Sequence, residues 1–201
     1  MTAAPAAPGR LERRKARTRA AILAAATRLF HEQGFEATSI QQIAELADTG
    51  VGTLYGYFHS KEDILREVLR QSRDEAVARY QSAVSADTPA IERISRALES
   101  MAAYLDQNRR VLVSVFRLAA KERPIDDDYA EWLLRSFTEL IEAGIRSGEF
   151  RAVPADAAAR MLITTVMTAT LGIGAWAGRH RDPDLLPEIQ QLARALLCRE
   201  P

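Results

Sequence analysis

Apolar residues recur along this chain with the spacing of α-helices, and this periodicity constrains the fold more than any other feature. Ile22, Ala25, Ala26, Leu29 and Phe30 lie at i, i+3, i+4, i+7 and i+8, so they form one stripe on a helix. No segment shows a convincing alternation of apolar and polar residues, which a half-buried strand would require. The sequence therefore predicts an all-α fold.

Turn and capping residues divide the periodic pattern into about nine helices. Gly34 and Gly148 follow helical segments, as glycines at helix C-termini do, and Pro89 marks a clear break. Ser39 and Gln42 have the spacing of a capping box. The expected helices cover about residues 11–33, 39–47, 51–58, 60–84, 90–107, 109–121, 126–147, 154–178 and 182–198.

Length, charge and cysteine content limit the class of protein. The chain has 201 residues, of which 47% are hydrophobic, so it can form one good core or a small domain joined to a larger one. Its formal net charge is zero, so any surface for nucleic acid must be local. The single Cys198 excludes a disulfide framework and a cysteine-based zinc site. Residues 1–9 lack the pattern of a secretory signal, so we expect a disordered tail and a cytoplasmic protein.

Two short predicted helices joined by a tight turn, at about residues 39–58, have the plan of a helix-turn-helix. The major groove of B-DNA admits one helix. Val51, Gly52 and Thr53 at the start of the second helix are small enough for close approach to the bases. Spacing alone leaves a plain helical hairpin as an equal alternative, because short helical turns are common.

A cluster of positive charge precedes this motif. Residues 10–19, which we call the basic arm, contain six cationic side chains and one acid, Glu12. A run of this kind is usually a solvated helix face. Its position beside the motif favours contact with DNA phosphates or with a minor groove instead. The six cations are Arg10, Arg13, Arg14, Lys15, Arg17 and Arg19.

Residues 34–47 and 52–62 resemble the signature of TetR-family transcriptional regulators. That signature reads approximately G-[FY]-x-x-T-[ST]-x-x-x-I-A-x-x-A-G-V-S-x-G-T-L-Y-x-Y-F-x-S-K-E, and the match extends over about residues 15–69. It is specific because many unlike residue types agree at fixed offsets, whereas the rest of the chain resembles the family only in helical plan and length. The resemblance implies a DNA-binding domain in residues 10–60 and an effector-binding, dimerising domain in residues 61–201.

The resemblance also implies which residues contact DNA. Thr38 and Lys61 match positions that touch the phosphate backbone, and the start of the recognition helix is expected to face the bases. Leu54 and Phe58 match buried positions that hold this helix. The expected DNA-binding residues are Thr38, Gln42, Thr49, Gly50, Val51, Gly52, Thr53, Tyr55, Tyr57 and Lys61.

Three residues depart from the signature in the turn. Asp48, Thr49 and Gly50 stand where glycine, valine and serine are usual. Asp tolerates a left-handed conformation better than most residues, so the turn is expected to survive. Few side chains of the motif can form bidentate bonds to bases. We therefore expect specificity to come from Thr53, from the glutamines of residues 41–42, from backbone contacts and from DNA shape.

Large apolar residues of the C-terminal part predict a ligand pocket, although core packing is the more frequent explanation for each of them. No cluster of buried charges is evident, so an apolar or aromatic small molecule is the expected effector. The expected pocket residues are Met101, Tyr104, Phe116, Trp132, Phe137, Met167 and Trp176.

The last predicted helix has the spacing of a coiled-coil seam. Leu185, Ile189, Leu192 and Leu196 are separated by four, three and four residues. Packing inside one chain explains this spacing equally well. The resemblance favours a homodimer, with Leu171 added to these four residues as the expected interface.

Other classes of protein fit the sequence less well. Residues 161–178 reach the lower limit for a membrane span but are only moderately apolar, so a helix buried on nearly all sides is expected. The histidines at 31, 59 and 180 are scattered and no catalytic motif occurs, so we expect no enzyme, no cofactor and no metal. The acids at 126–128 fit a helix N-terminus.

Three alternatives concern DNA binding itself. A helical scaffold with a vestigial motif would have lost Tyr55, Lys61 and the basic arm, which are present. A non-specific chromosome-binding protein disagrees with the zero net charge. An activator stays open. The expected function is a repressor that binds a palindromic operator as a dimer and is released by its effector.

Overall fold

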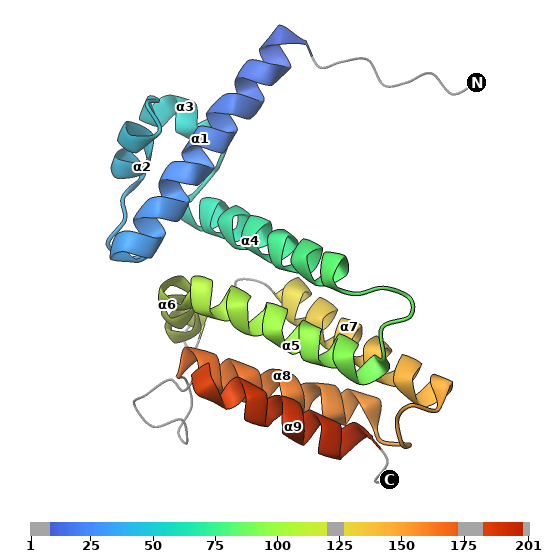
Figure 1. The fold of residues 1–201 in the computed structure, drawn as a ribbon. Coiled ribbons are helices and arrows are strands. Elements are labelled where there is room, and N and C mark those ends of the chain that lie inside the picture. Colours follow the sequence, from blue (N-terminus) through green and yellow to red (C-terminus); the bar gives the residue numbers. More distant parts are fainter. Residues whose placement is uncertain (1–8, 120–126, 173–182, 199–201) are drawn as a thin grey trace, which may run out of the picture. The chain divides into compact units, whose positions relative to one another are not determined.

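The computed structural model describes residues 9–119, 127–172 and 183–198, and the part it describes is helical apart from turns and one antiparallel bridge between Phe150 and Cys198. The predicted all-α class is confirmed (Figure 1). The chain divides into two compact units, residues 1–70 and residues 71–201. One long helix continues across the boundary between them.

The N-terminal unit contains α1 (Arg10–Gln33), α2 (Ile40–Leu46), α3 (Val51–Tyr55) and the start of α4 (Lys61–Ala83). The C-terminal unit contains the rest of α4, then α5 (Ala90–Gln107), α6 (Arg109–Ala119), α7 (Asp127–Ser147), α8 (Ala155–Leu171), the short 3-10 helix η1 (Pro183–Leu185) and α9 (Leu186–Leu197).

The core of the N-terminal unit forms where α1 packs on α2, with α3 next to α2. Ile22 and Phe30 of the predicted α1 stripe are fully buried, and so is Ile43 of α2. The predicted capping box starts α2: the Ser39 hydroxyl accepts a bond from the Gln42 N–H at 3.2 Å, and the Gln42 carboxamide oxygen accepts one from the Ser39 N–H at 2.8 Å. Local capping and one apolar stripe therefore place α2 against α1.

The core of the C-terminal unit lies among α5, α7, α8 and α9. Helix α5 contacts α7, α8 and α9, and α8 contacts α7 and α9 (Figure 1). Its fully buried side chains include Ile94 and Leu98 of α5, Ile141 of α7, Val166 of α8 and Leu197 of α9. Four amphipathic helices thus share one apolar interior.

Residues 149–151 join the ends of three of these helices, and we call them the clasp. The Glu149 carboxylate accepts a bond from the Ala90 N–H at 2.7 Å, at the start of α5. Together with the Ser147 hydroxyl, this bond lowers the pKa of Glu149. The Arg151 N–H donates to the Leu197 carbonyl at 2.9 Å, near the end of α9. The clasp links segments that are distant in sequence.

The structure corrects the extent of two predicted helices. Helix α8 ends at Leu171 because Gly172 adopts a left-handed conformation with φ 67° and ψ 35°, which a glycine adopts without a Cβ penalty. The prediction that this helix reaches Gly178 is therefore wrong at this position, and residues 173–182 lie outside the described part. Helix α3 ends at Tyr55, three residues before the predicted end.

The prediction that α8 is buried on nearly all sides is also wrong. Met161 is 60% exposed, and Thr164 and Thr165 are exposed as well. No helix among the described residues is long and apolar enough to cross a membrane.

Candidate nucleic-acid interface and ligand cavity

The turn between α2 and α3 adopts the conformation that its aspartate permits. Asp48 has φ 50°, a left-handed conformation, and the turn is present, so the expectation that the turn survives with an aspartate at this position is confirmed. The Thr49 N–H donates to the Ala44 carbonyl at 2.9 Å and closes the turn. Gly50 is extended and precedes α3 without a side-chain cap. Backbone bonds therefore orient α3, with no contribution from a serine cap.

Helix α3 shows small and polar side chains on its outer face. Gly52, Thr53 and Tyr55 are exposed, whereas Leu54 is fully buried. Phe58 is buried too, so the expected inward role of both apolar residues is confirmed. A Cβ added to Gly52 would meet no atom of the described part of the protein within 4 Å. The outer face of α3 is thus open to a partner at close range.

Two of the predicted DNA-binding residues, Thr38 and Gln42, form side-chain hydrogen bonds within the unit. Thr38 is only 1% exposed, and its hydroxyl donates to the Gly34 carbonyl at 2.7 Å and accepts from the Gln33 side chain at 3.2 Å. The Thr38 side chain is therefore not free to bind a phosphate, so the predicted phosphate contact at this position does not come from its hydroxyl. The Gln42 side chain, although exposed, also has partners, since its oxygen accepts bonds from the Ser39 N–H and from Gln33.

Lys61 has a role that sequence reasoning missed. Its ammonium group donates to the carbonyls of Phe35 and Thr38, each at 2.8 Å, and lies 3.5 Å from the carbonyl of Glu36. The same nitrogen is 4.4 Å from the centre of the Phe35 ring. Carbonyl bonds and a cation–π contact therefore direct the ammonium into the loop between α1 and α2. Lys61 holds that loop against the start of α4.

Arg19 belongs to the basic arm by sequence but to the packed unit by structure. Its guanidinium forms an ion pair with Glu67 at 2.8 Å and lies 5.2 Å from the centre of the Phe58 ring. Hydrogen bonds from Arg70 and then from Arg19 lower the pKa of Glu67 to about 2, against the effect of burial. Glu67 therefore stays ionised over the whole physiological range and ties α1 to α4.

A cavity of about 330 Å³ lies within the C-terminal unit, between α4, α5 and α7. Four of the seven predicted pocket residues line it: Met101, Tyr104, Trp132 and Phe137. Met167 does not line this cavity, while the Phe116 side chain and Trp176 lie outside what the structure describes. Helices α5 and α7 bring distant residues of similar chemistry to one place.

Sequence reasoning missed the contribution of α4 to this cavity. Ala76, Val77 and Tyr80 face it, and burial raises the pKa of the Tyr80 hydroxyl. Their i, i+1, i+4 spacing was the available signal, because it places them on one side of a helix. The charged lining residues are Arg73 and Glu139. The cavity is thus mostly apolar and aromatic, with a small number of polar groups.

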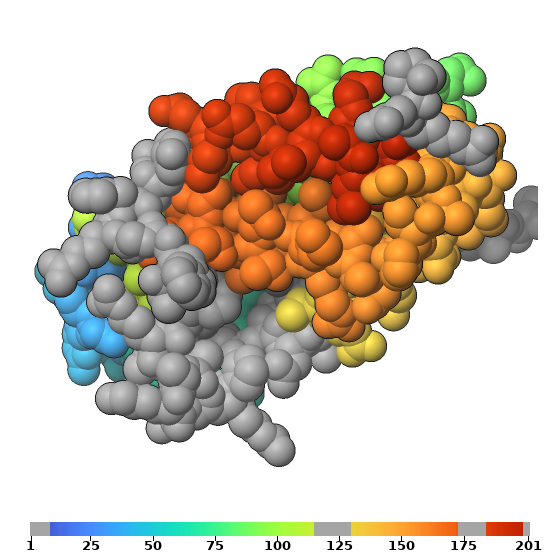
Figure 2. Space-filling model, turned by 90° about the horizontal axis from the view of Figure 1, so that it is seen from below, coloured from blue at the N-terminus to red at the C-terminus, as the bar shows by residue number. Residues whose placement is uncertain are grey.

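The predicted dimer seam is divided between the core and the surface. Leu171 and Ile189 are buried inside the chain, which corrects their assignment to an interface. Leu192 is 64% exposed and Leu185 is 37% exposed, and Leu196 is half-buried. The predicted seam is wrong at Ile189 because this residue lies on the same buried stripe of α9 as Ala193 and Leu197. Helices α8 and α9 lie side by side on one face of the unit (Figure 2).

Three comparisons with known proteins bear on this arrangement. A family model described as "Bacterial regulatory proteins, tetR family" matches residues 22–68. The HTH-type transcriptional repressor KstR2 of Rhodococcus jostii is 31% identical over 171 residues, which cover 77% of this chain and 79% of the relative.

Solved structures share the fold. A transcriptional regulator from Saccharomonospora viridis in complex with choline has a TM-score of 0.75 and 25% identity, covering 93% of this chain and 100% of its own. The regulator FadR from Bacillus subtilis in complex with stearoyl-CoA has a TM-score of 0.69 and 20% identity, covering 87% and 96% of the two chains. The second likeness shows the fold alone.

Proposed function

Because this chain belongs to the TetR family of bacterial regulatory proteins, we propose that it represses transcription from a palindromic operator as a homodimer and is released by a small, mostly apolar effector. It is a DNA-binding transcriptional regulator and not an enzyme.

The outer face of α3 carries the proposal. Gly52, Thr53 and Tyr55 are exposed on a helix held from behind by buried Leu54. A helix with small outer residues enters a major groove deeply, and the hydroxyls of Thr53 and Tyr55 can donate to base edges or phosphates. Val51 offers a methyl contact to thymine. We propose residues 10–60 as the DNA-binding domain, with Thr49, Gly50 and Tyr57 at the edges of this surface.

The surface of α8 and α9 supports a homodimer. Met161 is 60% exposed and Leu192 is 64% exposed, and the two helices that carry them are neighbours. A second copy of the chain would cover these apolar side chains in a symmetric, self-complementary contact. Two recognition helices then read two half-sites about one helical turn of DNA apart, which multiplies weak binding to each.

The cavity supports an effector with an apolar or aromatic body. Its volume of about 330 Å³ is sufficient for a small molecule, and Trp132 and Phe137 supply flat apolar surface. The choline bound to the Saccharomonospora relative is of this size class. Arg73 and Tyr80 of α4 line the cavity, and the same helix begins at Lys61, which holds the loop before α2. An effector that binds better to another position of α4 therefore disfavours the DNA-binding state.

Selection from a random duplex library tests the DNA-binding part. Native protein is expected to enrich an inverted repeat and to prefer it over scrambled DNA by about a thousandfold in fluorescence anisotropy. Tyr55→Ala is expected to lose most of this binding while its circular dichroism melting curve stays the same. Enrichment of a single asymmetric half-site overturns the dimer on a palindrome. Equal binding of selected and scrambled DNA overturns sequence-specific regulation.

Filling the cavity tests the effector part. Indole and choline serve as probes. A probe that occupies the cavity is expected to release the selected duplex or to raise the melting temperature of native protein. Val77→Phe places a ring into the space and is expected to abolish the response. Val84→Phe is the control, because Val84 also belongs to the C-terminal unit but does not line the cavity. An unchanged response in Val77→Phe rules out this cavity as the site of the probe.

A further inference from the structure

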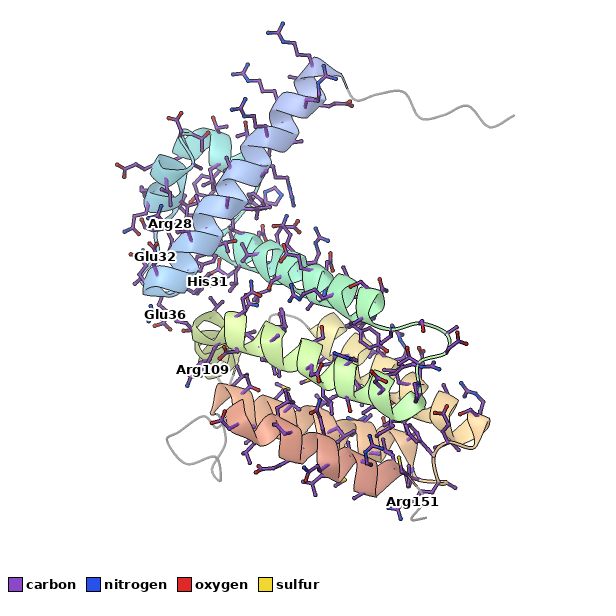
Figure 3. The ribbon with its side chains drawn as sticks, viewed as in Figure 1. Arg28, His31, Glu32, Glu36, Arg109 and Arg151 are labelled. Carbon is purple, nitrogen blue, oxygen red and sulfur yellow. The ribbon has the colours of Figure 1, made fainter. Side chains whose placement is uncertain are left out.

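The cations of the N-terminal unit fall into two groups. From residue 18 to residue 70, every arginine and lysine has a partner inside the unit, as Arg28 and Glu32 illustrate (Figure 3). The partnered cations are Arg19, Arg28, Lys61, Arg66 and Arg70. In contrast, Arg10, Arg14, Lys15 and Arg17 of the basic arm have no partner among the described residues. The uncommitted positive charge of this unit lies in the arm.

The charge of the motif itself makes this division important. Residues 18–60 contain two arginines against four acids, Glu32, Glu36, Glu45 and Asp48. DNA presents a dense row of negative phosphates, and affinity for it rests largely on cations that displace counterions. A reading helix in a region of net negative charge needs positive charge from elsewhere.

The arm has the geometry to supply that charge. Helix α1 begins at Arg10, and none of residues 10–21 is buried. The first turns of α1 extend past α2 and α3, and their side chains stand clear of the rest of this unit (Figures 1 and 3). At a rise of 1.5 Å per residue, the segment from Arg10 to Ile22 is about 18 Å long, about five base pairs of B-DNA.

Three of the arginines share one side of this projecting helix. Arg10, Arg14 and Arg17 are at i, i+4 and i+7, which places them along one face. The single acid of the arm, Glu12, is engaged at the helix start, where its carboxylate accepts the Gly9 N–H at 2.9 Å. The face therefore presents a row of guanidinium groups.

We propose that the basic arm provides the main phosphate contacts of this protein, lying along the DNA backbone outside the half-site that α3 reads. The proposal rests on the DNA-binding function proposed above and adds a second contact surface to it. DNA is favoured over an anionic membrane because the arm is continuous with the helix that packs on α2. Guanidinium groups bind phosphate oxygens through charge-assisted bonds without reading sequence.

The salt dependence of DNA binding tests this proposal. The triple variant R10Q, R14Q and R17Q is compared with a charge-matched control, R96Q, R146Q and R160Q, which removes three exposed arginines of the C-terminal unit. The slope of log K against log salt is expected to fall by about 2 to 3 in the arm variant, since each phosphate contact contributes about 0.9. At 150 mM salt the affinity is expected to fall about a hundredfold. Preference for selected over scrambled DNA stays unchanged.

The length of the DNA gives a second readout. Native protein is expected to bind a duplex that ends at the half-sites more weakly than one with ten extra base pairs on each side. The arm variant does not distinguish the two lengths, and the control variant behaves as native. Equal slopes for arm variant and native protein overturn the proposal, as does an equal loss in the control.

Two further outcomes separate this proposal from the function it rests on. If native protein binds no selected duplex at low salt, the DNA-binding function fails, and the arm proposal fails with it. In the other outcome, native protein and the arm variant bind DNA with the same salt slope, but only native protein sediments with vesicles of anionic phospholipid. The arm is then a membrane contact, and the proposal is overturned. Melting curves of both variants establish that they are folded.

Discussion

The two units of this protein organise their functional surfaces in opposite ways. The N-terminal unit places small side chains, such as Gly52 and Thr53, on the outside of α3, and Lys61 holds the loop before α2 through bonds to carbonyls 26 and 23 residues away. The C-terminal unit places large side chains, such as Trp132 and Phe137, around a partly open cavity, and bonds between distant segments hold this unit together. The proposed DNA contacts of the first unit are therefore exposed side chains, whereas the proposed effector site of the second unit is a cavity.

This difference decides what sequence reasoning can reach. The conformation of Asp48, the capping box at Ser39 and the burial of Leu54 were predicted because each depends on neighbours within a few residues. The role of Lys61 was not predicted, because a resemblance transfers a position and not the atom that a side chain binds. Local patterns therefore predicted the turn and the cap of the helix-turn-helix but not the long-range bonds of Lys61.

In the C-terminal unit, helical periodicity predicted which residues are apolar and helical but not which residues of other helices they contact. Met101 and Trp132 line the cavity, yet nothing in the sequence pattern showed that Tyr80 of α4 joins them. Ile189 and Leu192 belong to one heptad-like seam, but one is buried and the other exposed, because tertiary packing selects the covered stripe. The site in this unit emerges only when the helices are assembled.

The largest expected effect tests whether the C-terminal unit depends on its long-range clasp. A Cβ at Gly144 of α7 would overlap the ring of Phe150. Gly144→Ala is therefore expected to destabilise the protein by about 3 kcal/mol, the upper part of the usual range for overpacking. Urea unfolding measures the loss, and Phe150→Ala in the same chain is the partner for a double-mutant cycle. If the free-energy losses of Gly144→Ala and Phe150→Ala simply add in the double variant, overlap with the Phe150 ring is not the cause of the destabilisation.

A smaller effect is expected at the lysine that holds the N-terminal loop. Lys61→Met removes bonds to the Phe35 and Thr38 carbonyls and is expected to cost about 2 kcal/mol of unfolding free energy, the range for bonds to a charged donor. Thermal unfolding without DNA measures this loss. If the stability of Lys61→Met equals that of native protein while the salt slope of DNA binding falls, Lys61 is a phosphate contact and not a loop tether.

The ion pairs of Glu67 should make the N-terminal unit sensitive to acid. The folded state lowers the pKa of Glu67 from 4.5 to about 2, so the stabilisation is present above pH 4.5 and is lost as the pH falls toward 2. Glu67→Gln is expected to cost about 1 to 2 kcal/mol at pH 7, after allowance for solvent screening. Urea titrations at pH 7 and pH 3 measure the difference, which should shrink at the lower pH. A constant difference between pH 7 and pH 3 contradicts the ion-pair explanation.

The smallest effect on stability separates folding from DNA reading. Gly52 has open space around it, so alanine fits, and Gly52→Ala is expected to stabilise α3 by about 0.5 kcal/mol through its better helix propensity. The added methyl group would stand on the outer face of α3, which we propose to contact DNA, so affinity for the selected duplex is expected to fall about tenfold. Melting and anisotropy on the same sample give both values. Gly52→Ala that is both more stable and fully active would show that α3 does not approach DNA closely.

Helix α3 starts after Gly50 without a side-chain cap, so evolution can change the stability of this helix through a single residue. A Cβ there would be 3.9 Å from the Thr53 hydroxyl, so a serine fits the existing backbone. The serine hydroxyl could accept a hydrogen bond from a backbone N–H in the first turn of α3, which would stabilise this helix by about a few tenths of a kcal/mol. A lineage could therefore tighten or relax its hold on every target promoter together by exchanging glycine and serine at this position, without rewriting the promoters themselves.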